Sequence, residues 1–502
     1  MSSTADMAPA PAPIPQFKQV LGHPAPLWML FMSEFWERFA FYGIRWALVL
    51  YIVAQFHGGS NTGQADANLT YGSYLALVYA AAIFGGYIAD KIIGYQRSIL
   101  VGAFFMALGL FMISLPNPIL FKMGLATIIA GNGMFKPIIS TIVGKLYAVS
   151  DERRDSGFTI FYMGINAGAF LAPLFTGWLA TSVFGSTEIP AYKFVFIASG
   201  VGMLVSLVWF YFGRAQLQGI GEPAADQAGM QRVVYVMLGA LVAIPVIYFL
   251  LAVGAQTLQY VLSALFIILA IMLVTEGIRN GKVARDKVIA MMIIFTFNVL
   301  FWMFFEQAGS SFTFLADQIV DRNLGSFVFP TAWFQSVNSV AIIVFAPIMA
   351  WIWVKLARMN ANPSIPRKFG LGLLFNGLAF LLLMFALSSL VRADNKIPFW
   401  PLVAVYFIQS VGELCLSPIG LSMVTKLAPT RLVGLGMGGW FLSTGIGNNL
   451  SGIFASAVSG ETGMTVASAH SGYTFGFWAL MIAGVTLFVS APFINKLLHG
   501  VK

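Results

Sequence analysis

Residues 27–53 read LWMLFMSEFWERFAFYGIRWALVLYIV, an apolar run that carries the charged residues Glu34, Glu37, Arg38 and Arg45. About 20 predominantly apolar residues are enough for a helix to cross a bilayer. At about 100° per residue, these four side chains and the tyrosine between Arg38 and Arg45 share an arc of about 140°. Lipid would leave such a polar face unsatisfied, so the face must look at protein or water. The run therefore predicts a membrane-spanning helix with a functional polar face.

The composition of the whole chain agrees with this interpretation. Of 502 residues, 59% are hydrophobic and 9% are charged, whereas soluble domains carry about 25% charged residues. The net charge of +9 does not indicate a nucleic-acid partner, because the basic residues fall in short loops between apolar runs. The single cysteine, Cys415, excludes an intramolecular disulfide and a cysteine metal motif. The sequence predicts an all-α polytopic membrane protein whose solvent is the lipid bilayer.

Fourteen runs are long enough to cross the bilayer, and they fall into groups of six, two and six. They lie at residues 27–53, 70–90, 97–115, 119–146, 157–183, 192–213, 232–253, 257–278, 286–308, 329–356, 369–391, 398–426, 432–459 and 472–498. This division predicts a disordered cytoplasmic tail over 1–26, a six-helix bundle over 27–214, a linker with two additional transmembrane helices over 215–285, and a second six-helix bundle over 286–502.

The distribution of lysine and arginine predicts the orientation of these spans. Twenty of the 28 basic residues fall in the termini and in the loops on the same side, and only Lys193, Arg322, Arg392 and Lys396 fall in the opposite loops. Cytoplasmic loops carry the excess of basic residues, so we expect both termini to be cytoplasmic. Two six-span halves with this layout are typical of transporters, in which a substrate site forms between two rocking bundles.

Charged residues within the spans point to proton coupling. Unpaired, they would together cost about 20 kcal/mol in lipid; they are Glu34, Glu37, Arg38, Arg45, Lys136, Glu306 and Glu413. Four acids against three bases favour at least one carboxylate that titrates. A purely structural ion pair between Glu34 and Arg38 is the alternative for the first span, and snorkelling is the alternative for Lys136. The sequence contains no phosphate-binding loop, metal motif or Ser/His/Asp set, so an enzyme is not expected. We expect the proton to be the coupling ion, and we expect no cofactor.

Two motifs resemble known families. The stretch Gly85-Gly86-Tyr87-Ile88-Ala89-Asp90-Lys91, with Gly94 and Arg97, resembles the signature loop of the major facilitator superfamily. The stretch from Glu34 to Tyr42 resembles the ExxERFxYY motif of the proton-dependent oligopeptide transporters (POT), except that Phe41 replaces the first tyrosine. Residues 131–137, 161–168 and the Phe-Trp-x-x-Phe-Glu-Gln stretch that ends at Gln307 continue the resemblance along the chain. It implies a major facilitator fold and a bacterial inner-membrane symporter of di- and tripeptides.

The resemblance also implies roles for individual residues. Arg45 and Lys136 would receive the carboxylate of the peptide, and Glu413, with Asn166 and Asn338, its amino group. The side-chain pockets would be lined by Tyr42, Tyr79, Trp302, Ser417 and Trp440. The proton sites would be Glu34, Glu37 and Glu306, assisted by Arg38 and Lys136.

We further expect an outer gate that closes when Arg45 pairs with Glu306 and opens when Glu306 is protonated. Deprotonation of Glu37 would restore its attraction to Lys136 or Arg38 and reset the empty carrier. We expect a monomer. One alternative is a transporter of another small anion such as nitrate, although Glu413 suits an amine. The other is a membrane sensor that transports nothing.

Overall fold

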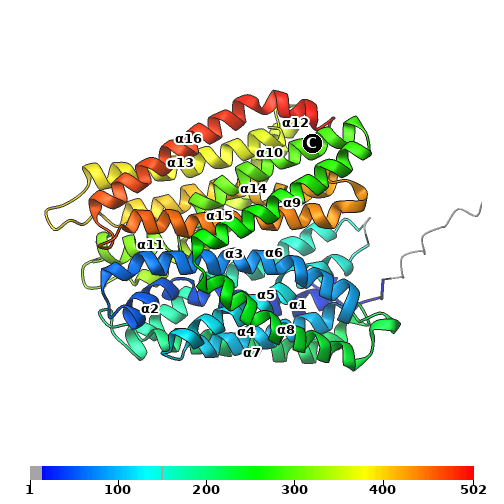
Figure 1. Ribbon diagram of the computed structural model, residues 1–502, viewed down its shortest axis with the longest axis horizontal. Coiled ribbons are helices and arrows are strands. Elements are labelled where there is room, and N and C mark those ends of the chain that lie inside the picture. Colours follow the sequence, from blue (N-terminus) through cyan, green and yellow to red (C-terminus); the bar gives the residue numbers. More distant parts are fainter. Residues whose placement is uncertain (1–13, 149–150, 502) are drawn as a thin grey trace, which may run out of the picture.

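The computed structural model describes residues 14–148 and 151–501, almost all of them in long helices that run roughly along one direction (Figure 1). The chain begins with a small hairpin, β1 (Gln19–Val20) and β2 (His23–Pro24), and α1 begins at Ala25. The expectation of a disordered tail is therefore wrong for residues 19–26. Residues 1–13 of that tail lie outside the described residues.

The first helix set packs around α1 and α5. It consists of α1 (Ala25–Arg45), α2 (Ala47–Phe56), α3 (Gln64–Ile88), α4 (Tyr95–Ile113), α5 (Pro118–Lys145), α6 (Arg154–Trp178) and α7 (Tyr192–Gly213). In this set α1 contacts α6 and α7, while α4 and α3 contact α5. Short helical turns join or extend these helices at Asn61–Gly63, Ala89–Ile93, Leu179–Val183 and Arg214–Leu217.

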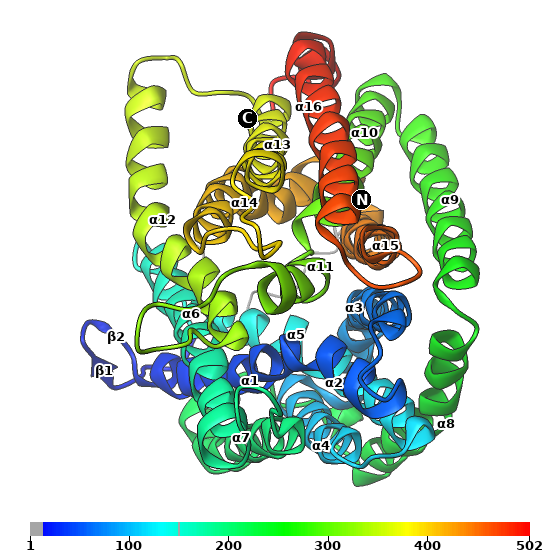
Figure 2. The same cartoon turned by 90° about the vertical axis from the view of Figure 1, so that its left-hand side faces the viewer.

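The second helix set lies opposite the first (Figure 2). It consists of α10 (Lys282–Phe305), α11 (Ser311–Phe314), α12 (Phe334–Arg358), α13 (Ile365–Ser389), α14 (Trp400–Leu427), α15 (Val433–Ser459) and α16 (Val466–Leu497). Here α13 packs against α14 and α16, and α10 against α15. Short turns lie at Leu315–Ile319, Thr331–Trp333 and Thr430–Leu432.

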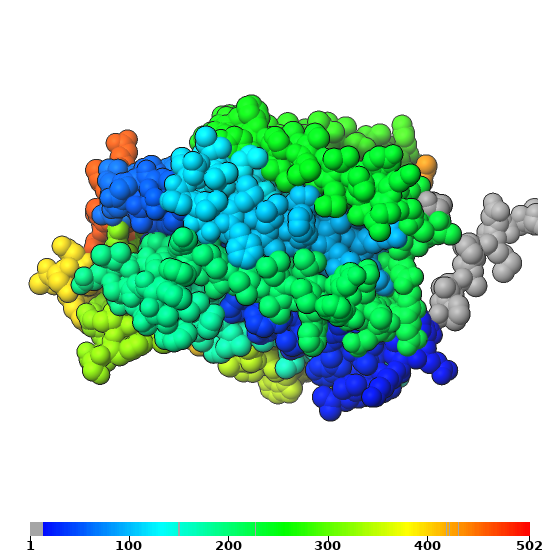
Figure 3. Space-filling model, turned by 90° about the horizontal axis from the view of Figure 1, so that it is seen from below, coloured from blue at the N-terminus to red at the C-terminus, as the bar shows by residue number. Residues whose placement is uncertain are grey.

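Two further helices bridge the sets. A short turn at Ala225–Gln227 leads into α8 (Met230–Ala252), which is followed by α9 (Ala255–Arg279). Helix α8 packs against α5 of the first set, whereas α9 packs against α15 and α10 of the second. In Figure 3 the green segment that includes α8 covers part of the cyan surface of the first set. The pair therefore touches both sets.

The first span is bent. Helices α1 and α2 meet at Trp46 with an angle of 44°. The cause lies in the neighbouring helix α6, where the Thr176 hydroxyl donates a hydrogen bond of 3.1 Å to the Gly43 carbonyl. A side chain that inserts into the helical hydrogen-bond ladder in this way is a known cause of kinks. The bend places Arg45 at the last position of α1.

The number of spans is close to the expected fourteen. Among the described residues, twelve helices are long and apolar enough to cross a membrane, or thirteen when the bent pair α1 and α2 counts as one span. The remaining expected span, 432–459, forms α15, which is not among them. Its sequence holds many glycines and small polar residues, and most of them are buried.

The two sets meet closely through α3 and α15 at the end of the molecule that carries α2, which we call the α2 end (Figure 1). The Asn68 side-chain amide donates hydrogen bonds to the Ala455 carbonyl at 3.1 Å and to the Ser459 hydroxyl at 2.9 Å. A Cβ built on Gly72 would lie 2.6 Å from the Gly452 Cα. Only glycine permits this approach of two backbones.

A substitution at this contact should separate the sets at the α2 end. We expect Gly72→Val to weaken the contact by about 1–3 kcal/mol, the usual cost of overpacking. A cysteine placed at the buried Ala455, in a Cys415→Ser background, should then react about 5 to 150 times faster with a membrane-impermeant maleimide. Gly239→Val is the matched control, because nothing lies within 4 Å of a Cβ at that position. Equal reactivity in the two folded variants would refute the role of Gly72.

Candidate functional site

The charged face of α1 forms a buried ion cluster. The Arg38 guanidinium pairs with Glu37, through Nη2 to Oε1 at 2.6 Å, and with Glu34 Oε1 at 3.2 Å. From α5, the Asn132 amide donates to Glu37 Oε1 at 3.2 Å. Glu34 Oε2 is buried and has no hydrogen-bond partner in the part of the chain that the structure describes. The local Glu34–Arg38 pair thus exists, but it is one contact of a larger cluster.

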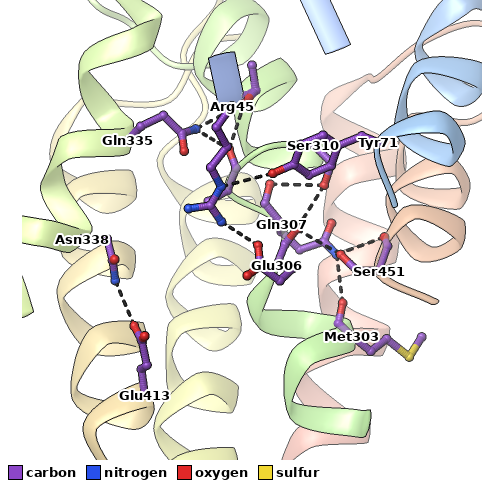
Figure 4. Close-up of polar contacts among 12 residues, drawn as sticks. Arg45, Tyr71, Met303, Glu306, Gln307, Ser310, Gln335, Asn338, Glu413 and Ser451 are labelled. Atoms are coloured by element: carbon purple, nitrogen blue, oxygen red, sulfur yellow. Dashed lines mark hydrogen bonds and ion pairs between the residues drawn. The ribbon is translucent and has the colours of Figure 1, made fainter. Parts of the chain in front are cut away.

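An ion pair joins the two helix sets at the bend of the first span (Figure 4). Arg45 Nη2 lies 2.6 Å from Glu306 Oε2, and Arg45 Nε donates to the Tyr71 hydroxyl at 3.1 Å. Arg45 and Glu306 are 8% and 9% exposed. Breaking a buried pair by removing one partner leaves an uncompensated charge and costs about 3–5 kcal/mol. This pair therefore holds the first and second sets together.

Glu306 is presented by a break in the helix rather than by a regular turn. Helix α10 ends at Phe305, and α11 begins at Ser311. Between them, the Gln307 amide donates to the Ser451 hydroxyl at 2.9 Å, and that hydroxyl donates to the Glu306 carbonyl at 3.0 Å. Sequence reasoning missed Tyr71, Gln307 and Ser451. Gln307 had been noted only as the end of a motif, and the signal for Tyr71 and Ser451 was the presence of polar side chains inside apolar runs.

Lys136 and Arg45 each make a cation–π contact with a tyrosine ring. Lys136 Nζ lies 4.4 Å from the centre of the Tyr79 ring, and Arg45 Cζ lies 5.6 Å from that of Tyr42. Such contacts are favourable within about 6 Å of the ring centre. Within the described residues, no carboxylate lies at ion-pair distance from Lys136. Of the two partners expected for Glu37, Arg38 forms the ion pair in this conformation and Lys136 does not.

The acidic side of the site lies on the second helix set. Glu413 Oε2 accepts a hydrogen bond of 3.3 Å from the Asn338 amide, which also donates to the Ser410 hydroxyl at 2.8 Å (Figure 4). On the facing set, the Asn166 amide donates to the Tyr162 carbonyl of its own helix at 3.0 Å. Tyr162 is 41% exposed, yet its hydroxyl is within electrostatic reach of Glu413. Glu413 on α14 and Asn166 on α6 thus lie on opposite helix sets.

The remaining predicted residues lie on the second set. Trp302 Nε1 donates to Asn298 Oδ1 at 3.0 Å. Trp440 is 6% exposed, with its ring packed against Phe295 and Phe369. The Ser417 hydroxyl is buried and has no hydrogen-bond partner among the residues that the structure describes. Trp440 is therefore part of the aromatic core here, and not an open pocket wall.

The site places opposite charges on the two helix sets. Arg45 and Lys136 place positive charge on the first set, while Glu413 places negative charge on the second. Glu413 interacts electrostatically with both Arg45 and Glu306. An arrangement of this kind suits a ligand with a negative and a positive end. The described residues contain no group of three or more metal-ligating side chains.

Comparison with known proteins gives a consistent result. The sequence pattern of the POT family matches residues 96–471. The chain is 36% identical to peptide transporter YePEPT of Yersinia enterocolitica, over 89% of this chain and 90% of the relative. It is 33% identical to dipeptide and tripeptide permease B of Salmonella typhimurium, over 87% of that protein.

Solved structures show the same architecture. A mutant of peptide transporter POT in complex with alafosfalin matches with a TM-score of 0.81 and 33% identity, over 96% of this chain and 97% of that one. A POT family transporter in complex with 5-aminolevulinic acid matches with a TM-score of 0.80 and 29% identity, over 95% and 98% of the two chains.

Proposed function

Because this chain belongs to the POT family, we propose that it is a proton-coupled symporter that imports di- and tripeptides by alternating access. The family is one of peptide transporters and not of enzymes. The observation that carries the proposal is the buried Arg45–Glu306 pair, which joins the two helix sets. A proton can bind to Glu306, and the carboxylate of a peptide can bind to Arg45. Glu413 on the second set supplies the acid that a peptide amine needs.

The peptide would lie between the two sets with its ends held by opposite charges. Its carboxylate would bind Arg45 and Lys136, and its amino group would bind Glu413 with help from Asn338 and Asn166. The side chains of the peptide would contact Tyr42, Tyr79, Trp302, Ser417 and Trp440. Asn166 and Trp440 would have to leave their present contacts to take part, which a rocking motion of the bundles provides.

The gate would be controlled by the charge of Glu306. Protonation removes the negative charge from the carboxyl group, so the pair with Arg45 loses its Coulomb attraction and the α2 end opens. An arriving peptide carboxylate then competes for Arg45. Glu34 and Glu37, paired with Arg38, would exchange the proton on the other side of the cycle. Each step shifts the populations of two conformations, as alternating access requires.

We also propose the placement in the membrane. The excess of basic residues at the terminal end predicts that both termini face the cytoplasm of a bacterial inner membrane. The closed α2 end would then face outward, so the structure corresponds to an inward-facing or occluded carrier. Residues 27–214 and 286–502 would be the rocking bundles, joined by the accessory pair in 215–285. A single copy would contain the whole pathway.

Uptake into proteoliposomes tests this function. Labelled dialanine or trialanine should accumulate at least tenfold more with an inward proton gradient than without one, because the gradient drives the symport. An excess of unlabelled dialanine should abolish the uptake, whereas nitrate should not, since it has no positive end for Glu413. Uptake of labelled nitrate without uptake of dialanine would favour the anion transporter, and a lack of proton-driven dialanine flux would contradict the proposed symport.

A further inference from the structure

The helix break that presents Glu306 is held by side chains that the proposed transport cycle does not use. The Gln307 side chain is fully buried, and each of its polar atoms is satisfied. Its amide donates to the Met303 carbonyl at 3.0 Å and to both the carbonyl and the hydroxyl of Ser451 on α15. Its Oε1 accepts from the Ser311 hydroxyl at 2.6 Å. Gln307 therefore ties the end of α10, the start of α11 and α15 together.

Ser451 connects this break to the contact between the two helix sets. Its hydroxyl accepts from Gln307 and donates to the Glu306 carbonyl at 3.0 Å. The next residue, Gly452, forms the close backbone contact with Gly72 of α3. A shift of the Glu306 backbone must therefore move α15 where it touches the first set, because packed backbones cannot absorb the displacement.

Tyr71 closes the connection into a ring (Figure 4). It precedes Gly72 on α3, and its hydroxyl accepts the hydrogen bond from Arg45 Nε at 3.1 Å. A Cβ on Gly309, within the break, would lie 2.1 Å from the Tyr71 hydroxyl oxygen. Contacts thus run from Arg45 to Glu306, through Ser451 and Gly452 to Gly72, and through Tyr71 back to Arg45.

We propose that Gln307 and Ser451 are positioning residues of the outer gate, which transmit the state of the Arg45–Glu306 pair to the contact between α3 and α15. This inference rests on the proposed proton-coupled function. With the ring intact, loss of the ion pair releases the Glu306 backbone and the α3–α15 contact together. Without the Ser451 hydroxyl, the Glu306 carbonyl keeps only the donor from within the break, Ser310 at 3.3 Å, and loses its link to α15. The helix contact then no longer follows the ion pair.

The pH response assigned to the ring depends on the groups around Glu306. They are Arg45 on α1, Tyr71 and Tyr79 on α3, and Tyr406 and Glu413 on α14. Arginine and tyrosine do not ordinarily change charge between pH 5 and 8. Glu413 is the other acid in this group, and Glu34 and Glu37 are further proposed proton sites, so a pH response that remains in a Glu413→Gln background is assigned to Glu306 only if Glu306→Gln removes it.

The test measures the gate directly and needs no substrate. A cysteine at Ala455, in the Cys415→Ser background, reports the opening of the α2 end by its rate of reaction with an impermeant maleimide between pH 5 and pH 8. At each pH this rate is divided by the rate for free cysteine, because only the thiolate reacts and its fraction falls with the pH. With the ring intact, the normalised rate should rise at least fivefold as the pH falls. In Ser451→Ala it should vary less than twofold. Gln307→Met, which removes the amide donor without adding a titratable group, should behave like Ser451→Ala.

Ser206→Ala is the matched control. The Ser206 hydroxyl is equally buried and donates to the Ser33 carbonyl of a neighbouring helix at 2.8 Å, but within the first set. This variant should keep the pH response. A response in Ser451→Ala and Gln307→Met equal to that of Ser206→Ala would overturn the inference; if only one variant folds, that variant decides. A failure of the transport function itself would appear separately, as absent proton-driven uptake by the unmodified protein.

Discussion

Glu306→Gln is expected to reduce proton-driven accumulation of dialanine at least tenfold while retaining exchange of dialanine across the membrane. Glutamine keeps the shape of the side chain and can still accept a hydrogen bond from Arg45, which lies 2.6 Å away. It cannot ionise, however, so it resembles a permanently protonated Glu306. The gate would then lack the charged state that closes it without substrate, and uphill transport would lose its coupling to the gradient.

Two measurements in proteoliposomes check this expectation. The first is accumulation of labelled dialanine with an inward proton gradient, and the second is counterflow at equal pH on both sides. Glu276→Gln is the matched control, because Glu276 is also an ion-paired acid on a helix, 3.9 Å from Arg279, but lies away from the site. Full accumulation by Glu306→Gln would contradict the gating scheme, whatever the result for counterflow.

Glu413→Gln is expected to weaken dipeptide binding by about 10 to 150 times. A hydrogen bond to a charged group contributes about 1.5–3 kcal/mol, and each 1.4 kcal/mol changes the affinity about tenfold. The variant keeps an oxygen that can accept from Asn338, which now donates to Glu413 at 3.3 Å. The loss would therefore report the missing charge opposite the peptide amine, and not a collapse of the site.

A pair of ligands separates this role from a general defect. The unmodified protein should bind dialanine much more tightly than N-acetyl-dialanine, which has no charged amine. In Glu413→Gln the two affinities should approach each other, mainly because dialanine binds less well. If the variant still discriminated between them as strongly as the unmodified protein, the amine would have to be recognised elsewhere.

The individual helices were largely predictable, because each span must satisfy its own backbone hydrogen bonds in lipid and therefore shows as an apolar run. Helix α8, for example, was predicted at 232–253 and is observed at Met230–Ala252. The bend at Trp46 was not predicted, since its cause is a hydroxyl on α6, far away in the sequence. The hairpin at residues 19–24 was also missed, as its segments are too short for a recognisable pattern.

The sequence by itself determined that this protein spans a membrane, that its first span carries a charged face, and which residue types make up the candidate site. Those properties depend on composition and on helical periodicity, which are local. The hypothesis drawn from the sequence paired Arg45 with Glu306, and Glu37 with Lys136 or Arg38. Only the tertiary structure brought Arg45 and Glu306 together across 261 positions, and only it paired Glu37 with Arg38 and not Lys136. It alone also placed Tyr71, Gln307 and Ser451 around that pair. Contacts between helices depend on how the bundles pack, and side-chain packing leaves no periodic signal in the sequence.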